Sequence, residues 1–502
     1  MSETGNFSIL CQSQAETEQF AETLALAIRK HDFITLSGDL GSGKTTLARH
    51  LIRIVLDDLE AEVPSPTFTL VQPYEGGHVG LLSHYDLYRM GEPEELEELG
   101  LDDAIAEGVV LLEWPEMAKD ALPKPDLSIT IEHDSQSDHR RFLVTGNDDA
   151  VSRVRRSQSI REFLDQTGTW QRRHLTGDAS ARAYETVIPD QGSACVLMNA
   201  PRLPDGPPIR DGKPYSSIAH LAEDVTAFVA VNQLLSDHGF RTPTIHHQDL
   251  SSGLLLMEDL GAGKIVDDNG EPVEDRYLAS VEALAKMHDQ SWPDQITVAE
   301  GITHHIAPYD REAFLIEVEL LTDWYAPYRL GRKCDASERQ AFLQIWDDLF
   351  DVVDKGEKSL VLRDFHSPNI IWRDFDTGTD RTALIDFQDA LIGPSAYDLA
   401  SLSQDARVTV SPQLEQKLLE HYFASRGDCN RDDMLKIHAI MAAQRATKVL
   451  GIFVRLFQRD HKDGYLRHLP RIETYLARNL KHPALAEYRT WIETVLQIDS
   501  DN

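Results

Sequence analysis

The sequence predicts an α/β protein made of two successive parts, and two stretches carry this prediction. In the first, the apolar residues 33–37 predict a buried strand, a glycine-rich loop follows at 38–45, and residues 46–52 have a helical pattern. In the second, one apolar strand leads into Asp364, and another at 382–385 leads into Asp386. Strands that alternate with helices indicate the α/β fold class.

The composition limits the classes of protein to which the chain can belong. A length of 502 residues, with 41% hydrophobic and 26% charged residues, is typical of a globular protein with two or three domains. The net charge of −34 disfavours strong direct binding of nucleic acid, because like charges repel. The four cysteines lie far apart, which indicates reduced, structural thiols, and they are Cys11, Cys195, Cys334 and Cys429. We expect a cytoplasmic protein without a membrane segment, since neither a basic, apolar leader nor a long apolar run is present.

The first part contains a phosphate-binding loop. A helical stripe at 17–30 precedes the strand, and the loop then matches the pattern G-x-x-x-x-G-K-[ST] between a strand and a helix. Its glycines allow backbone N–H groups to surround phosphate oxygens, Lys44 reaches the outer phosphates, and Thr45 offers a hydroxyl to Mg²⁺. The predicted nucleotide-binding residues here are Gly38, Gly41, Gly43, Lys44, Thr45 and Thr46.

Two carboxylates are candidates to complete this site. Asp86 closes the apolar run 81–86, and Glu113 closes the run 109–113. In a parallel sheet both would emerge at the carboxyl ends of the strands, beside the phosphate loop. Glu113 is the preferred second magnesium contact. The alternative is a solvated carboxylate at a strand end, which is the stronger alternative for Asp86.

These motifs, in this order and spacing, resemble a known family. Together with the loop at 38–45, the stretches 65–70 (SPTFTL), 84–89 (HYDLYR) and 112–115 (LEWP) resemble the ATPase subunit of the bacterial tRNA threonylcarbamoyladenosine machinery, the TsaE family. The resemblance implies ATP binding between subunits of that complex, and hydrolysis that supports adenosine modification in tRNA. It also places Thr67 in a switch-like loop, Thr45 and Glu113 on the metal, and Asp86 and Trp114 along the site.

A polar stretch at 148–157, after Gly146-Asn147, predicts the boundary between domains 1–150 and 151–502. A short helical lead at 161–166 follows, and residues 175–187 then predict a strand, a small-residue turn and a strand. The next strand, 195–200, lacks the lysine that a kinase uses to hold phosphates. Arg182 is a candidate substitute, with an exposed structural arginine as the alternative. Glu223 is predicted within a helix at 218–235.

Residues 253–261 predict a strand that enters a hinge. In a kinase the backbone of such a hinge hydrogen-bonds the adenine, so Met257 and Asp259 are predicted as nucleotide-binding residues. A buried strand followed by a turn is the alternative.

The stretch 361–387 carries the pattern expected for phosphoryl transfer. Asp364 is the candidate base for a substrate hydroxyl, while Asn369 and Asp386 are candidate oxygen ligands for Mg²⁺. The residues between them predict a hairpin that brings both metal ligands to its open end. A hairpin at a sheet edge with solvated acids is the alternative for either half alone, but both halves in order favour a kinase. Asp398 follows in the first turn of a predicted helix, and residues 444–456 predict an amphipathic helix with basic residues.

The second part resembles the aminoglycoside phosphotransferase superfamily, and within it the N-acetylmuramate/N-acetylglucosamine anomeric kinases of cell-wall recycling. The resemblance rests on the stretches 177–180, 196–201, 256–261 and 448–456, beside the catalytic hairpin. It implies a bilobal kinase-like fold and phosphorylation of an amino sugar at its anomeric hydroxyl. Members of the group also tend to lack the strand lysine.

The sequence therefore predicts a bifunctional protein that uses ATP and Mg²⁺ in an N-terminal P-loop ATPase domain and a C-terminal sugar kinase domain. Its expected partners are a small sugar and the protein subunits of the threonylcarbamoylation complex. Two alternatives remain for the second domain: another small alcohol as substrate, such as an aminoglycoside or choline, or a non-catalytic nucleotide-binding scaffold.

Overall fold

A computed structural model describes residues 6–92, 95–118, 121–133, 139–175, 182–202 and 204–498. The chain divides into two compact units, Met1–Ala200 with His247–Met257 and Pro201–His246 with Glu258–Asn502. Both units combine helices and strands, so the predicted α/β fold class is confirmed. Within these described ranges, none of the helices is long and apolar enough to cross a bilayer.

The first unit contains a seven-stranded sheet in the order β1-β7-β6-β2-β5-β4-β3. Its central strands β6, β2, β5 and β4 run parallel, whereas the pairs at both edges are antiparallel. The sheet is therefore mainly parallel at the place where the phosphate loop leaves it. The strand bounds are β1 Asn6–Cys11, β2 Phe33–Ser37, β3 Val71–Gly76, β4 Gly80–Asp86, β5 Val109–Glu113, β6 Leu127–His133 and β7 Arg140–Gly146.

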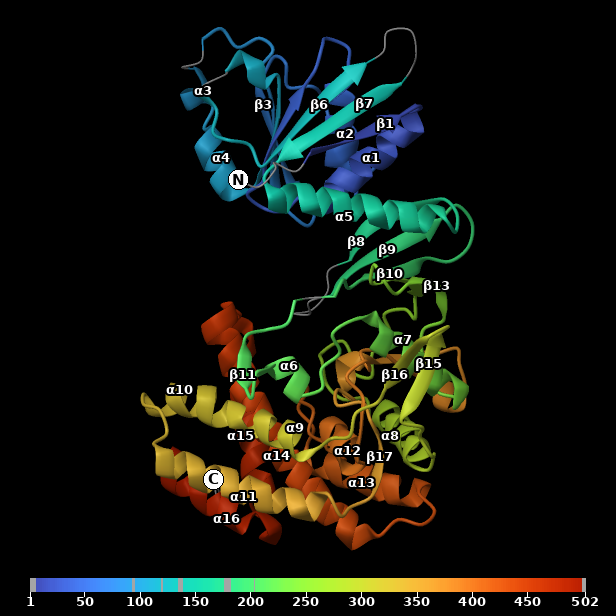
Figure 1. The fold of residues 1–502 in the computed structure, drawn as a ribbon, viewed down its shortest axis with the longest axis vertical. Coiled ribbons are helices and arrows are strands. Elements are labelled where there is room, and N and C mark those ends of the chain that lie inside the picture. The colour runs from blue at the N-terminus through green and yellow to red at the C-terminus, as the bar shows by residue number, and fades with distance from the viewer. Residues whose placement is uncertain are drawn as a thin grey trace. The chain divides into compact units, whose positions relative to one another are not determined.

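Helices cover both faces of this sheet (Figure 1). Alternate residues of β2 and β5 enter two separate apolar cores, because successive side chains of a strand point to opposite faces. One core contains Ile34 and Leu111 with α1 and α2, and the other contains Phe33 and Val110 with α3 and α4. The helix bounds are α1 Gln14–Ala27, α2 Lys44–Val55, α3 Glu95–Glu98 and α4 Leu101–Glu107.

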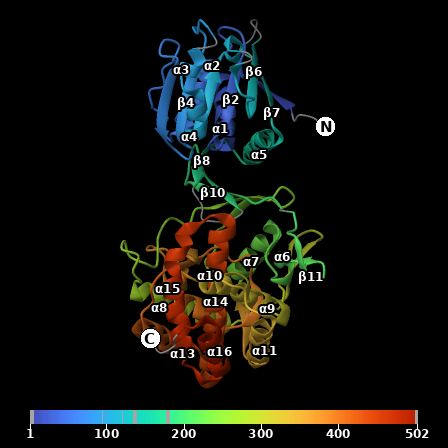
Figure 2. The same cartoon turned by 90° about the vertical axis from the view of Figure 1, so that its left-hand side faces the viewer.

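The polar stretch predicted as a domain boundary is not a loop. It is the first half of α5, Asp148–Asp165, a helix of 18 residues capped by the Asn147 side chain. Its first turns pack into the core of the seven-stranded sheet through Val151 and Val154, and its last turns contribute Phe163 to a separate core. The helix lies between the two sheets of the first unit (Figures 1 and 2).

The core that contains Phe163 is separate from both cores of the seven-stranded sheet, and it belongs to a five-stranded sheet in the order β13-β14-β10-β9-β8. The predicted strands on either side of residues 176–181 are present, and the turn itself lies outside the described residues. The bounds are β8 Trp170–Leu175, β9 Ala183–Pro189, β10 Cys195–Asn199, β13 Ile245–Asp249 and β14 Leu254–Glu258.

The second unit is mostly helical, and its long central helix α14 packs against α9, α12 and α15. Gly451 allows the approach of α14 to α9, because a Cβ at this position would lie 2.4 Å from the backbone of Leu320. The helix bounds are α6 Tyr215–Ile218, α7 Val225–Asp237, α8 Glu274–His288, α9 Arg311–Leu320, α10 Ala326–Leu330, α11 Ala336–Val353, α12 Ala396–Ser403, α13 Pro412–Ser425, α14 Arg431–Asp460, α15 Leu469–Asn479 and α16 Ala486–Trp491.

Short strand pairs complete the second unit and include the predicted hairpin. In that hairpin β18 pairs with β19, and Ile370 lies opposite Leu384. The antiparallel pairs are β11 Pro208–Arg210 with β12 Lys213–Pro214, β15 Gln295–Ala299 with β16 Ile302–His305, β17 Lys358–Val361 with β20 Leu391–Pro394, and β18 Ile370–Trp372 with β19 Thr382–Leu384.

The helix predicted at 218–235 is interrupted, and the placement of Glu223 within it is wrong. The carboxylate of Asp224 caps α7 by accepting a hydrogen bond from the Thr226 backbone N–H, so the helix begins only after it. Glu223 precedes this cap, is exposed, and forms an ion pair with Arg202 at 3.0 Å.

Candidate active sites

The phosphate loop adopts a backbone that only glycine tolerates well. Gly38, Gly41 and Gly43 have φ values of 143°, 81° and 107°, which are unfavourable for residues with a Cβ. At Gly38 a Cβ would also lie 2.6 Å from the carbonyl oxygen of Ile131. The loop ends at α2, whose free N–H groups and dipole favour an anion.

Lys44 lies inside this loop and is 4% exposed. Its Nζ donates to the carbonyl oxygens of Gly38 at 2.7 Å and Asp39 at 3.0 Å, and it lies 3.5 Å from the ring centre of Trp114. Burial lowers the pKa of Lys44, although Glu113 and other acids oppose this effect. Trp114, which was predicted to line the site, thus makes a cation–π contact with Lys44, and its role in binding a nucleotide stays a prediction.

Asp86 and Glu113 lie side by side at the carboxyl ends of β4 and β5, as predicted for parallel strands. Thr45 donates its hydroxyl hydrogen to Glu113 Oε2 at 2.9 Å. A hydroxyl and a carboxylate at this separation are oxygen ligands of the kind Mg²⁺ takes beside nucleotide phosphates. The residues present therefore fit the predicted metal, and both would hold it.

The carboxylate of Asp86 also accepts a hydrogen bond from Thr67, which is another predicted site residue. Its Oδ2 accepts hydrogen bonds from Thr67 at 2.6 Å and from Ser65 at 3.0 Å, while its Oδ1 accepts from the Tyr88 backbone at 3.0 Å. Asp86 thus anchors the loop that carries Thr67. Thr46 lies half-buried in the first turn of α2.

The second site forms where β17 and the hairpin β18–β19 end. Asn369 Nδ2 donates to the carbonyl oxygen of Asp364 at 3.0 Å and lies 3.3 Å from Asp386 Oδ2. Gln388 donates to the other carboxylate oxygen of Asp386 at 2.9 Å. Residues from two segments of the sequence, 364–369 and 386–388, are therefore brought together, and the amide oxygen of Asn369 and the carboxylate of Asp386 fit a magnesium site.

Positive charge surrounds the candidate base. Asp364 Oδ1 lies 4.0 Å from His366 Nε2 and 4.0 Å from Arg445 Nη2. Desolvation raises the pKa of Asp364, but the charges of His366, Arg445 and Lys448 outweigh this effect and lower it overall. The carboxylate is half-exposed, so a substrate hydroxyl can reach it.

Buried residues whose contacts the sequence did not reveal hold the backbone beside Asp364 in place. Asp398 accepts hydrogen bonds from the backbone N–H groups of Leu362 at 2.6 Å and Arg363 at 2.9 Å. The Arg363 side chain pairs with Glu317, which also accepts from Lys448 at 2.7 Å. Two acidic residues, Glu317 and Glu319, interrupt the apolar run 313–321, and such acids within an apolar helix are a sequence signal for a buried charge cluster.

The predicted hinge residues lie at the end of β14. Met257 is buried in the strand, and Asp259 is exposed and accepts a hydrogen bond from the Gly261 backbone at 2.8 Å. Their role in binding a nucleotide stays a prediction. β10 contains no lysine, and its partner strand β9 contains none either.

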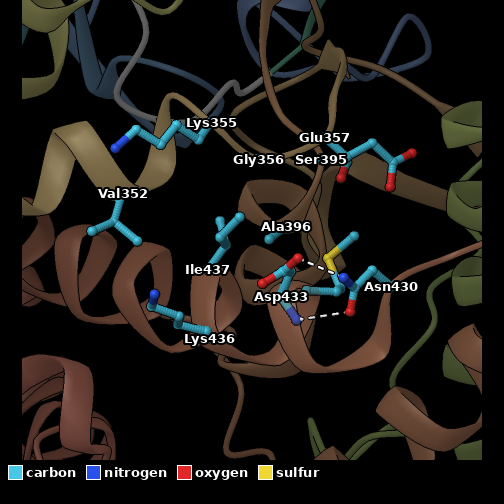
Figure 3. Close-up of a pocket in the computed structure, with 11 residues that line it drawn as sticks. Val352, Lys355, Gly356, Glu357, Ser395, Ala396, Asn430, Asp433, Lys436 and Ile437 are labelled. Atoms are coloured by element: carbon cyan, nitrogen blue, oxygen red, sulfur yellow. Dashed lines mark hydrogen bonds between the residues drawn. The ribbon is translucent and has the colours of Figure 1, made fainter.

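A cavity of about 330 Å³ lies elsewhere in the second unit (Figure 3). Asn430 and Asp433 on its wall bond to each other and cap α14, and none of the predicted site residues lines it. Its lining residues are Val352, Lys355, Gly356, Glu357, Ser395, Ala396, Asn430, Asp433, Met434, Lys436 and Ile437.

The fold and these sites define a P-loop nucleotide-binding module joined to a kinase-like phosphotransferase. The chain belongs to the phosphotransferase enzyme family, whose model matches residues 131–434, and its N-terminal part belongs to the family of the threonylcarbamoyl adenosine biosynthesis protein TsaE, whose model matches residues 11–142. The protein is thus an enzyme of ATP-dependent phosphorylation with a TsaE-type ATPase domain.

Relatives match the two parts separately. The N-acetylmuramate/N-acetylglucosamine kinase of Caulobacter vibrioides is 31% identical over 66% of this chain and 94% of its own length. The TsaE protein of Rickettsia bellii is 36% identical over 25% of this chain and 87% of its own length. Among solved structures, the ADP-bound aminoglycoside phosphotransferase APH(2'')-Ib is similar, with 14% identity, a TM-score of 0.40, and coverage of 63% of this chain and 96% of that chain.

Proposed function

We propose that the chain is bifunctional: an ATPase that supports threonylcarbamoyladenosine formation in tRNA, and a kinase that phosphorylates N-acetylmuramate or N-acetylglucosamine at the anomeric hydroxyl. The relatives of each part bear these names and supply the substrate classes. The convergence of Asp364, Asn369 and Asp386 is the observation that carries the kinase proposal.

In the kinase reaction, Asp364 would accept the proton of the sugar hydroxyl as its oxygen bonds to the γ-phosphorus of ATP and the bond to ADP breaks. Asn369 and Asp386 would hold magnesium, which neutralises phosphate charge when bound. The charges of His366 and Arg445 lower the pKa of Asp364, which favours the ionised carboxylate that the proposed proton transfer requires.

In the ATPase domain, the loop glycines and Lys44 would bind the phosphates, and Thr45 and Glu113 would hold magnesium. Thr67, anchored by Asp86, would respond to the bound nucleotide, and Trp114 would line the site. We also propose that this domain works with protein subunits of the threonylcarbamoylation complex in the cytoplasm. Its partners would contact the tRNA, because the net charge of −34 disfavours direct binding.

The kinase proposal is tested on the full-length chain with ATP, Mg²⁺ and N-acetylmuramic acid, with the product followed by phosphorus NMR. We expect a sugar 1-phosphate, and a rate about 10²- to 10⁴-fold lower in Asp364→Asn, because general-base help has this magnitude. Asp380→Asn is the matched control, since Asp380 is an exposed acid in the turn of the same hairpin. An unchanged rate in Asp364→Asn would remove this residue from the mechanism.

The absence of a lysine from β10 favours a second candidate, a nucleotide-binding scaffold without catalysis. If Lys44→Ala still binds ATP but no alcohol is phosphorylated, this candidate replaces the first. A panel with aminoglycosides, choline and amino sugars separates the scaffold from a kinase for another alcohol.

A further inference from the structure

A buried histidine lies against the candidate metal ligand of the ATPase domain. His84 is in β4 and Glu113 ends the neighbouring strand β5, and their side chains are 0% and 1% exposed. His84 Nε2 lies 2.9 Å from Glu113 Oε1. The sequence motif 84–89 included this histidine, but neither proposed reaction uses it.

The two carboxylate oxygens of Glu113 contact two different residues. Oε1 contacts His84, and Oε2 accepts the hydroxyl hydrogen of Thr45 at 2.9 Å. A rotation of the carboxylate would break both contacts at once. The oxygen that faces Thr45 is therefore held where the phosphate loop meets β5.

The hydrogen bond defines which ring nitrogen of His84 carries hydrogen. An ionised carboxylate only accepts hydrogen bonds, so Nε2 must donate. Nδ1 is buried and has no hydrogen-bond partner among the residues that the structure describes, so hydrogen on Nδ1 would be unsatisfied. Hydrogen on Nε2 is therefore the arrangement that forms the bond to Glu113 Oε1.

We propose that His84 is a positioning residue of the ATPase site, which orients Glu113 so that Oε2 and the Thr45 hydroxyl together receive the magnesium of a bound nucleotide. This inference rests on the proposed function of the N-terminal domain. Outer partners of metal ligands commonly change metal affinity or activity by about 10- to 100-fold when they are replaced.

The test measures ADP affinity by calorimetry on the full-length chain, with Mg²⁺ and with EDTA. The same titrations of Lys44→Ala measure ADP binding at the nucleotide site of the kinase domain. This contribution is subtracted from the titrations of the chains with an intact phosphate loop. His84→Asn removes the donor from the reach of Glu113, whereas His84→Gln keeps an amide N–H at a similar distance. Ser83→Ala is the matched control, because Ser83 is the buried neighbour whose side chain points to the other face of the sheet.

In His84→Asn we expect the gain in ADP affinity on addition of Mg²⁺ to be about 10- to 100-fold smaller than in the unmodified chain. The ADP affinity in EDTA is expected to be unchanged. His84→Gln is expected to regain most of the loss, and Ser83→Ala to behave like the unmodified chain. Full magnesium-dependent tightening in His84→Asn, or equal losses in the Asn and Gln variants, would overturn the inference. Identical titrations of the unmodified chain and Lys44→Ala would overturn the proposed function and this inference with it.

Discussion

His366, Arg445 and Lys448 together supply positive charge around the candidate base, and Arg445 is the buried arginine among them. Its guanidinium is buried, lies 4.0 Å from Asp364, and has no hydrogen-bond partner for Nε among the described residues. Because Asp364 must lose its own proton before it can accept one, a nearby cation extends its activity to lower pH.

Replacing Arg445 by Met is therefore expected to raise the pKa of Asp364. The acidic limb of the pH profile of kcat/KM would then move to higher pH, while the rate at alkaline pH would change less. The profile is measured by steady-state kinetics with the sugar substrate. As a control, Arg431→Met removes an exposed arginine from the same helix. An acidic limb that does not move would show that Arg445 leaves the base unaffected.

At the scale of elements, α9 and α14 are joined by a buried charge cluster. Glu317 accepts hydrogen bonds from Tyr309 at 2.6 Å and from Gln444 at 2.9 Å, besides its pairs with Lys448 and Arg363. Burial by itself raises the pKa of Glu317. The charges of Lys448 and Arg363 outweigh this effect and lower the pKa to about 2. The cluster fixes the start of the catalytic loop, because Arg363 precedes Asp364.

Replacing Glu317 by Gln leaves two buried cations without their counter-charge. We expect the free energy of unfolding to fall by about 3–5 kcal/mol, as for other broken buried pairs. Chemical denaturation measures this change. Glu312→Gln on the exposed face of α9 is the control, and its ion pair should contribute less than about 1 kcal/mol. Equal effects of the two substitutions would contradict the role of the cluster.

His438 in α14 predicts an acid-sensitive step in stability. Burial lowers its pKa from 6.5 to about 4, with Arg478 and His482 adding to the effect. The folded state thus favours the neutral ring, so its contribution is complete above about pH 6.5 and is lost as the pH falls toward about 4. His438→Gln can still bond to Ser403 but does not titrate, and is expected to flatten the dependence of unfolding free energy on pH over this range. An unchanged slope would assign the loss to other groups, such as His288.

The sequence predicts an element correctly where its local residue pattern and its chemistry indicate the same structure. The loop at 38–45 and the strands that end in Glu113 and Asp386 were found because glycines and terminal acids are local signals. The continuous helix α5 was missed because its charges dominated the interpretation, although Asn147 is a favourable helix cap.

Residues that act across the fold could not be found in this way. Asp398 and the partners of Glu317 meet the catalytic loop only after folding, since Lys448 is 131 positions from Glu317. His84 was visible in a motif, but only the pairing of β4 with β5 shows what it contacts.

At the scale of the first unit, the ATPase sheet and the five-stranded sheet share a buried ion cluster. Glu22 of α1 pairs with Arg161 of α5 and accepts a hydrogen bond from the Arg172 backbone at 2.8 Å. Arg172 in turn pairs with Glu185 of β9 at 2.7 Å. The boundary between domains 1–150 and 151–502 stays a prediction, and α5 packs on both sides of it.

Glu22→Gln is accordingly expected to destabilise the first unit by about 3–5 kcal/mol, because the buried Arg161 would lose its buried counter-charge and keep only the more exposed Asp165 at 3.9 Å. Hydrogen exchange should show faster opening in both α1 and β8. Glu18→Gln, on a less buried position of the same helix, is the control. Faster exchange confined to α1 would show that the two sheets do not share this cluster energetically.

Crossed variants of the phosphate loop and the candidate base test whether one chain holds two separate ATP sites. Sugar phosphorylation and nucleotide stoichiometry are measured for Lys44→Ala and Asp364→Asn in the full-length chain. We predict that Lys44→Ala binds one nucleotide fewer and keeps its sugar kinase rate, whereas Asp364→Asn loses the rate and keeps the stoichiometry. Loss of sugar phosphorylation in Lys44→Ala would contradict the account, because it would show that the two sites do not work separately.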